Sequence, residues 1–285
     1  MFEYLIHILI LISIYAILTM SFSLALGYTG LPCFALPAFF AIGAYTSVFV
    51  TRAGAPYLLA VALSALIPAF CSYVMSFPAL QMRGDYFAIV TLGFSEMARL
   101  VLLNESARYS AAGDVGIVGV GAPVIFGFEF SSLPSFFLLS LAFMLVVYLI
   151  LRRVVSSPYG RVIRAIRDDE VVTDVIGKDT KRFKVEVLVV MAFFCGIGGS
   201  LWAHYIQHLH PTQFTSDLLV FMLASVVMFN EENITGAIFG ALFMVTFPEL
   251  MRFFGLSESH IGASRLTILG GTLVTVILIR ERSRG

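Results

Sequence analysis

The chain has 285 residues, of which only 13% are charged, and its formal net charge is zero. Its mean hydropathy of +0.94 is far above that of a water-soluble domain, in which about 25% of residues are charged. These values exclude a surface built for water and predict an all-α integral membrane protein. The neutral charge balance also argues against nucleic acid as a partner.

Nine apolar stretches are long enough to be considered as membrane spans, since a spanning helix needs about 20 mostly apolar residues. In chain order they cover residues 4–26, 30–51, 56–80, 86–104, 133–151, 184–207, 214–229, 234–254 and 263–280. The first is interpreted as a retained span, because no basic stretch typical of a signal peptide precedes it. The short stretch 214–229 is interpreted as a half-helix or a re-entrant segment. We expect one transmembrane domain over residues 1–285, with about eight to ten transmembrane helices, some of them broken or re-entrant.

The connection from Gly27 to Pro37 interrupts the apolar pattern with two glycines and two prolines. Proline removes a backbone donor, and irregular backbone persists at membrane depth only inside protein or along a wet cavity. The pattern favours a broken helix on a transport pathway, although a plain helix–turn–helix at the membrane surface fits residues 27–32 as well. The candidate pathway residues are Gly30, Pro37, Phe39, Gly43, Tyr45, Thr91 and Glu96.

The fourth stretch carries two charges, Glu96 and Arg99, which are three residues apart and are predicted to pair on one helix face. A lone charge near the bilayer centre costs about 2.5–3.5 kcal/mol. Arg99 is near the external end of this stretch, where its side chain can reach water. The pair is therefore interpreted either as a structural ion pair or as part of a substrate site. Thr91, about one turn from Glu96, is expected to face the same interior.

The segment 152–184 holds nine of the 18 Lys and Arg residues, including all the lysines. Cytoplasmic loops are enriched in these residues, so this segment is predicted to be cytoplasmic. The same threading places Arg280, Arg282 and Arg284 inside, and the N-terminus and the long loop 105–132 outside. That loop is rich in glycine and is either an irregular external connection or a docking surface for a partner.

Residues 160–177 are predicted to form a short amphipathic helix. Its polar face mixes arginines with the acids at 168–170. Binding to lipid alone favours basic residues without acids, so the mixed face favours a protein partner. The apolar stripe consists of Val162, Ile163, Ile166, Val171, Val172 and Val175.

Catalytic and metal-binding patterns are missing from this sequence. Gly177 and Lys178 are followed by Asp179, which does not fit a phosphate-binding loop. His204 and His208 have no Glu or Cys beside them and are interpreted as a polar cap at the external end of a span. We therefore expect no enzyme activity, cofactor or metal. The three cysteines all lie within apolar stretches and are interpreted as small packing residues. They are Cys33, Cys71 and Cys195.

Three blocks of the sequence resemble a known family. They are GYTGLPCFALPAFFAIGAYT at 27–46, RGDYFAIVTLGFSEMARLVLLN at 83–104 and SPYGRVIRAIRDDEVVTDVIGKDTKRFKVEVLVVMAFFCGIGGSLWAHY at 157–205, followed by Pro211 and Phe214. On these residues the chain resembles the LivM-type permease subunits of bacterial ABC importers for branched-chain amino acids.

The resemblance implies a multi-pass permease in the lipid of a bacterial cytoplasmic (inner) membrane. It implies three kinds of partner: a second, related permease subunit, two cytoplasmic ATPase subunits and an external substrate-binding protein. The segment 160–177 is similar to the helix through which ABC importers couple to their ATPases. The implied coupling residues are Gly160, Arg161, Arg164, Arg167, Asp168, Asp169, Glu170 and Gly177.

Two departures from the family pattern leave the substrate open. Residues 229–233 replace a glycine-rich turn, and residues 35–38 replace a segment with a polar side chain. A subunit of a urea or short-amide importer is one alternative, because its permeases are very similar. A self-contained secondary transporter or channel is the other, and it would need buried ionisable sites, for which Glu96 and Glu249 are the candidates.

Overall fold

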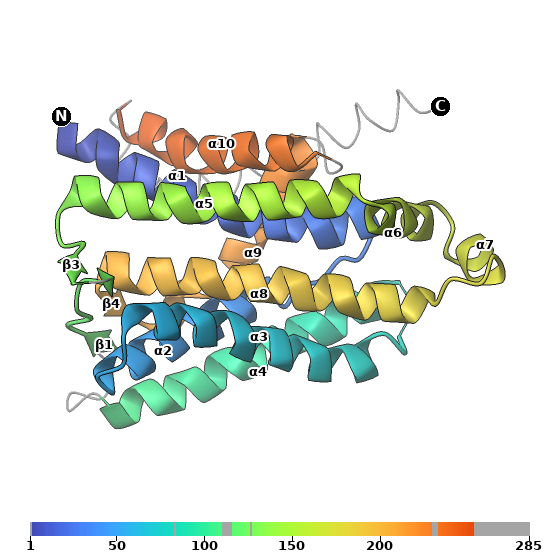
Figure 1. Cartoon of the computed structure of the whole chain (residues 1–285). Coiled ribbons are helices and arrows are strands. Elements are labelled where there is room, and N and C mark those ends of the chain that lie inside the picture. The colour runs from blue at the N-terminus through green and yellow to red at the C-terminus, as the bar shows by residue number, and fades with distance from the viewer. Residues whose placement is uncertain (1, 83, 110–115, 126, 230–232, 254–285) are drawn as a thin grey trace.

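A computed structural model of the chain describes residues 2–253 except 83, 110–115, 126 and 230–232. The long helices lie side by side in a bundle (Figure 1). The helices are α1 (Phe2–Ser23), the π-helix η1 (Leu24–Tyr28), α2 (Leu36–Arg52), α3 (Tyr57–Ala79), α4 (Asp85–Tyr109), α5 (Leu133–Ser156), α6 (Pro158–Asp168), α7 (Glu170–Val175), α8 (Thr180–Ile206), the 3-10 helix η2 (Pro211–Gln213), α9 (Ser216–Met228) and α10 (Ile234–Phe253). The short strands are β1 (Ile117–Val118), β2 (Val124–Ile125), β3 (Phe128–Glu129) and β4 (His208–Leu209).

The membrane-spanning character of the bundle follows from its longest helices. Within the described residues, 6 segments are long and apolar enough to cross a membrane, and α2 and the 234–247 part of α10 are shorter apolar helices. The prediction of an all-α membrane protein is thereby confirmed. The expected half-helix or re-entrant segment at 214–229 contains α9, whose 13 residues rise about 20 Å. With η2 before it, α9 belongs to the candidate span Pro211–Met228, so a half-helix there stays a prediction. The expected span 263–280 and the arginines after it lie outside the described residues.

The centre of the bundle is α8, which packs most extensively against α2 and α3. Glycines make this approach possible: a Cβ on Gly43 would lie 2.4 Å from the Cα of Gly196, and one on Gly199 would lie 2.2 Å from the carbonyl oxygen of Phe40. A Cβ on Gly196 would lie 1.9 Å from the carbonyl oxygen of Ser64. Small residues let membrane helices meet backbone to backbone, so these glycines fix how the central helices cross.

The broken segment after α1 lies inside the protein. The helix α1 continues into η1, and the irregular residues 29–35 that follow are mostly buried before α2 begins with Pro37 in its first turn. Protein groups satisfy this backbone: the Leu31 amide donates to the Ala25 carbonyl at 2.9 Å, and the Phe34 amide donates to the Thr91 hydroxyl at 3.0 Å. The hydrocarbon offers no hydrogen-bond partners for such groups. Thr91 of α4 therefore stabilises the irregular backbone by accepting the Phe34 amide. Gly30 itself is exposed, and both readings of residues 27–32, an interrupted helix and a turn at the membrane surface, stay predictions.

The two ends of the bundle differ. One end, the α7 end, carries α6 and α7, and the opposite end, the strand end, carries the short strands and the start of α1 (Figure 1). Antiparallel pairing of β1 with β4 sets Ile117 opposite Leu209 and ties the loop 105–132 to the chain that follows α8. The loops predicted on opposite membrane faces thus lie at opposite ends of the bundle, while the side that faces the cytoplasm stays a prediction.

Candidate functional site

The segment 160–177 is not one helix, and this prediction was wrong. Two helices, α6 and α7, meet at Asp169, whose backbone is extended with φ −156 and ψ 108. The Asp169 carboxylate accepts hydrogen bonds from the amides of Val171 at 2.9 Å and Val172 at 3.0 Å. Aspartate is a preferred N-cap because its short side chain satisfies the free amides of a first turn, so the residue that ends α6 also starts α7.

The helix α6 is fixed against its own chain. A Cβ on Gly160 would lie 2.0 Å from the carbonyl oxygen of Val155, so only glycine allows the turn out of α5. Ile163 is fully buried and Ile166 nearly so. The first half of the predicted apolar stripe is therefore part of the permease core and is not available to a partner.

Two of the predicted coupling arginines contact the broken segment. The guanidinium of Arg164 lies over the Tyr28 ring, 5.1 Å from its centroid, a cation–π contact. Arg167 donates a hydrogen bond to the Gly27 carbonyl, and a Cβ on Gly30, where φ is +70, would lie 3.2 Å from the Arg167 Cγ. The predicted coupling segment and the predicted pathway break thus touch directly. Their separation in sequence gave no sign of this contact.

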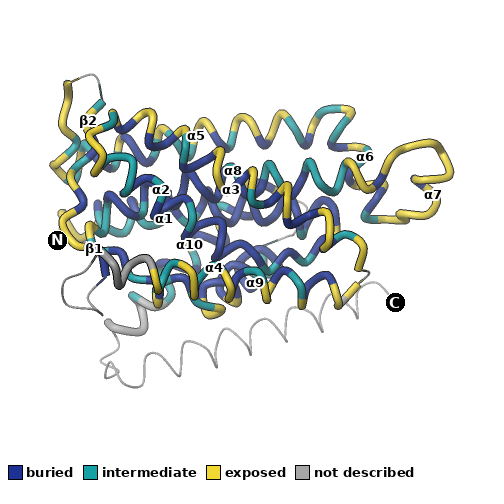
Figure 2. The backbone as a smooth tube through the Cα atoms, turned by 90° about the horizontal axis from the view of Figure 1, so that it is seen from below, coloured by how far each residue is buried: buried dark blue, intermediate teal, exposed yellow. Residues whose placement is uncertain are grey.

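The second half of the apolar stripe is exposed. Thr173 is buried, whereas the opposite side of α7 points away from the bundle, and the tube in Figure 2 is exposed along most of this helix. We call this surface the α7 face; its residues and exposed fractions are Val171 72%, Val172 52%, Val175 82% and Ile176 72%. Sequence reasoning did not include Ile176 in the stripe.

The position of α7 is held by its ends. The Glu170 carboxylate oxygen Oε1 lies 2.6 Å from the Lys184 Nζ and accepts a hydrogen bond from the Thr180 hydroxyl at 3.5 Å, which joins α7 to the start of α8. Gly177, with φ +89, ends α7 in a conformation that favours glycine. Two of the predicted coupling residues, Arg161 and Asp168 of α6, are exposed.

The buried pathway candidates take part in packing. The Phe39 and Phe94 rings are 5.8 Å apart, and the Tyr45 and Phe214 rings are 6.3 Å apart. Pro37 is buried in the first turn of α2, where proline fits because no amide is required. A role of these side chains in the pathway stays a prediction.

Glu96 and Arg99 form the expected ion pair, but it faces outward. The Arg99 Nε lies 3.0 Å from the Glu96 carboxylate. The Glu96 side chain is 51% exposed and the Arg99 side chain 22% exposed. Thr91 is fully buried, so the expectation that Thr91 and Glu96 share one interior was wrong. Five residues at 3.6 per turn place them about 140° apart around α4.

The polar cap expected at the strand end is only partly right. His204 is buried and not in contact with water; its Nδ1 lies 3.0 Å from the Ser200 carbonyl oxygen, and its ring meets Tyr57 at 4.8 Å. His208 is half-buried in β4. In the described part of the chain no group of three or more His, Cys, Asp or Glu side chains could hold a metal ion.

Comparison with known proteins settles the family. A family model described as the branched-chain amino acid transport system, permease component, matches residues 4–279. The chain belongs to this family. The permease is 31% identical over 293 aligned residues to the high-affinity branched-chain amino acid transport system permease protein LivM of Escherichia coli (strain K12), an alignment that covers 94% of this chain and 67% of that protein.

Other relatives agree. The LivM protein of Salmonella typhimurium is also 31% identical, over 94% of this chain and 67% of its own length. A probable branched-chain amino acid transport permease protein LivM of Methanocaldococcus jannaschii is 26% identical over 68% of this chain and 56% of its own length. No solved structure matches the chain. The resemblance read from the sequence blocks is confirmed, and the permease is a multi-pass inner-membrane transport protein.

Proposed function

We propose that the permease is the membrane-spanning subunit of an ATP-driven importer for branched-chain or other apolar amino acids, and that separate ATPase subunits act on it through α6 and α7. Its relatives are named for branched-chain amino acid transport, and a largely apolar interior suits an apolar substrate. The observation that carries the coupling role is the α7 face, an apolar surface outside the bundle.

The α7 face is suited to a protein socket. Burial of apolar surface stabilises a complex by about 25 cal/mol per Å². Exposure of these four side chains to water is unfavourable, so a partner that covers them gains this stabilisation. The surrounding charges include both signs, which suits a partner of mixed charge better than anionic lipid. In the proposed assembly the groove of an ATPase subunit covers Val171, Val172, Val175 and Ile176.

The contacts of α6 suggest how a push on α7 reaches the transport path. Movement of α7 displaces α6, which ends immediately before it. Arg167 of α6 is bonded to the Gly27 carbonyl and lies against Gly30. Displacement of α6 therefore acts on the broken backbone after α1, where few regular hydrogen bonds resist movement.

Two surface helices indicate where a second permease subunit packs. The exposed large side chains of α5, from Leu138 to Ile150, are all apolar, which suits lipid. The exposed face of α4 instead carries Glu96 and Arg99, with Glu96 about 16 Å along the helix from Asp85 at 1.5 Å per residue. Charges at that depth normally face protein or a water-filled cavity, so we place the second subunit, and the transport path between the two subunits, against α4. The strand end would then receive the external binding protein.

The proposal is tested with the permease reconstituted together with a second permease subunit, ATPase subunits and an external binding protein from the same organism. Val175→Asp places a charge in the proposed apolar socket and should weaken ATPase docking about tenfold or more, with a matching loss of ATP-driven leucine uptake. Val175→Leu keeps an apolar side chain at the same exposed position and should retain uptake.

Wild-type uptake by Val175→Asp, measured in vesicles with equal permease content, would refute coupling through α7. Uptake of labelled urea in place of leucine, isoleucine or valine by the wild-type complex would refute the substrate class while leaving the coupling role intact.

A further inference from the structure

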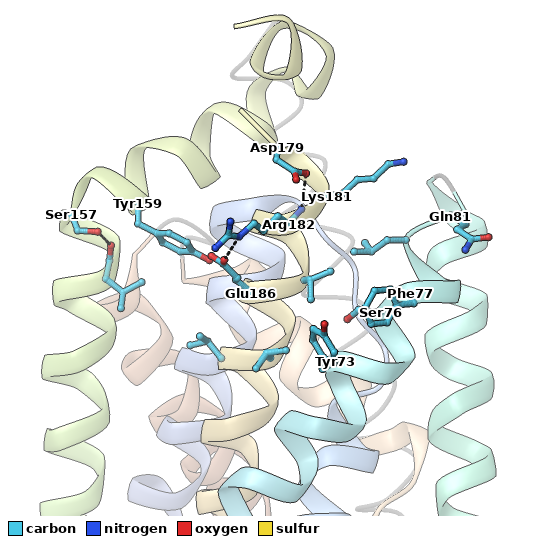
Figure 3. A pocket seen from close by; sticks show the side chains of 15 residues that line it. Tyr73, Ser76, Phe77, Gln81, Ser157, Tyr159, Asp179, Lys181, Arg182 and Glu186 are labelled. Carbon is cyan, nitrogen blue, oxygen red and sulfur yellow. Dashed lines mark hydrogen bonds and ion pairs between the residues drawn. The ribbon is translucent and has the colours of Figure 1, made fainter. Parts of the chain in front are cut away.

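A large groove runs along α8 at the α7 end. Its volume is about 1010 Å³. One wall is the end of α3, the other is the corner where α5 turns into α6, and the floor is the first half of α8 (Figure 3). We call it the α8 groove.

The α8 groove has two chemically different zones. Its deeper part is apolar and aromatic and is lined by Val185, Val189 and Val190 of α8 and by Tyr73 and Phe77 of α3. Tyr73 and Phe77 are 47% and 54% exposed, so the groove is open sideways to whatever surrounds the bundle. At membrane depth such an opening meets hydrocarbon chains.

Charged groups gather at the other zone, the rim beyond the end of α3. The two acids there contact Arg182: the Asp179 carboxylate accepts the Arg182 amide at 3.1 Å and keeps its negative charge, and Glu186 pairs with the Arg182 Nε at 3.0 Å. Lys181 makes no ion pair or side-chain hydrogen bond within the described part of the chain. Figure 3 shows it extended away from Arg182 and Glu186, above the side that α3 lines.

The polar groups at the α6 wall do not cancel this charge. Burial, and secondarily the Glu186 carboxylate, raise the pKa of the Tyr159 phenol, so Tyr159 stays neutral at physiological pH. Arg182 keeps further guanidinium donors beyond the one that Glu186 takes, and its side chain is 75% exposed. The rim carries the cations Lys181 and Arg182 and the carboxylates Asp179 and Glu186. What it offers an anion is the Lys181 ammonium, which pairs with neither carboxylate, and the spare guanidinium donors of Arg182.

This division into an apolar floor and a charged rim with a free ammonium matches the two parts of a phospholipid. Tyrosines concentrate at the depth where headgroups begin, and basic pockets between helices on the cytoplasmic side of a membrane bind anionic headgroups. We propose that the α8 groove binds an anionic phospholipid, with its phosphate at Lys181 and Arg182 and an acyl chain along Phe77 and Val189. The proposal rests on the predicted cytoplasmic position of the α7 end, and its test needs neither a transported substrate nor an ATPase.

A second permease subunit is a less suitable occupant of the groove. The polar pair at mid-depth that requires protein cover is on α4, and α3 stands between α4 and the groove (Figure 3). In the deeper zone the exposed side chains are apolar or aromatic, which a hydrocarbon chain covers without any partner group.

The full-length permease, purified in detergent, is titrated with phosphatidylglycerol or phosphatidylethanolamine and its bound lipid is measured by native mass spectrometry. Phosphatidylglycerol should bind more tightly to the wild type. Lys181→Gln should lower that affinity about fivefold, since one lysine near a membrane surface contributes about as much. Lys178→Gln removes the same charge from the exposed turn after α7 and should leave binding unchanged.

Val189→Trp fills the apolar floor, and it should reduce retention of both lipids without removing the preference for phosphatidylglycerol. Free glycerol phosphate should not compete, because it lacks the acyl chain. Equal binding of the two lipids by the wild type would overturn the proposal, as would equal effects of Lys178→Gln and Lys181→Gln. Loss of the bound lipid when the second permease subunit is present would show a protein interface instead. None of these results depends on transport.

Discussion

The neighbouring helices α6 and α7 carry the same kind of apolar residues and use them in opposite ways. Ile163 and Ile166 of α6 are buried in the permease, whereas Val171 and Val175 of α7 are 72% and 82% exposed. An amphipathic pattern therefore tells which side chains need cover, but not which molecule provides it. In this segment α6 is an anchor and α7 is the presented surface.

The difference depends on one residue between the two helices. Asp169 leaves the helical conformation and caps α7, so the two apolar stripes need not face the same way. Had α6 continued without a break, its stripe would have held α7 against the same core. The cap is thus what frees the second helix for a partner.

The distinction between α6 and α7 would be wrong if the apolar side chains of both helices contributed equally to the stability of the fold. Ile163→Ala should lower the unfolding free energy by about 2–5 kcal/mol, as removal of a fully buried isoleucine side chain does. Val175→Ala should change it by less than about 0.5 kcal/mol, because the side chain is mostly exposed. Thermal unfolding of the purified permease, followed by tryptophan fluorescence, measures both, and similar losses of stability would contradict the division into anchor and surface.

A second test sharpens the role of the cap. Asp169→Ala should destabilise α7 by about 1 kcal/mol, seen as roughly fivefold faster hydrogen exchange of the α7 amides. Asp169→Asn keeps a capping side chain without the charge and should restore slow exchange. Uncoupled ATP hydrolysis in Asp169→Asn would show that an ATPase reads the charge itself, and unchanged exchange in Asp169→Ala would show that the cap does not set the break. Asp168→Ala, at the exposed neighbour, is the control.

The smallest effect is expected at the contact between Glu170 and Lys184. Glu170 is 47% exposed and Lys184 is 14% exposed. Because water reaches the carboxylate and screens the pair, we expect it to contribute within the range of about 0–1 kcal/mol found for exposed ion pairs. Lys184→Gln should therefore speed exchange of the α7 amides only slightly, and more at low salt than at high salt. Lys178→Gln removes an equal charge nearby and should have no effect. A salt-independent collapse of α7 in Lys184→Gln would mean that this pair, and not the cap, holds the helix.

Much of the fold was predictable because lipid imposes strict rules on a chain. The apolar stretches, the break between Gly27 and Pro37 and the short α9 could all be read from residue order, since each hydrocarbon-embedded group must be apolar or satisfied within the protein. The pairing of Glu96 with Arg99 was also predictable, because three-residue spacing on a helix sets it locally.

The candidate site was predictable only in part. The sequence predicted which positions of the charged segment are apolar, but this prediction treated them as one helix with one face. The contacts of Arg164 with Tyr28 and of Arg167 with Gly27 join residues more than a hundred positions apart. No local pattern encodes a contact of that kind.

Composition and periodicity alone determined that this is a membrane protein, where its helices lie and which segment carries the charge, because helix formation and burial in lipid are local, additive preferences. The tertiary structure decided which apolar surfaces stay uncovered, that Glu96 points outward, and that the charged segment touches the broken helix. These outcomes depend on the angles and distances at which helices pack, and packing at Gly43, Gly196 and Gly199 is set by many side chains at once.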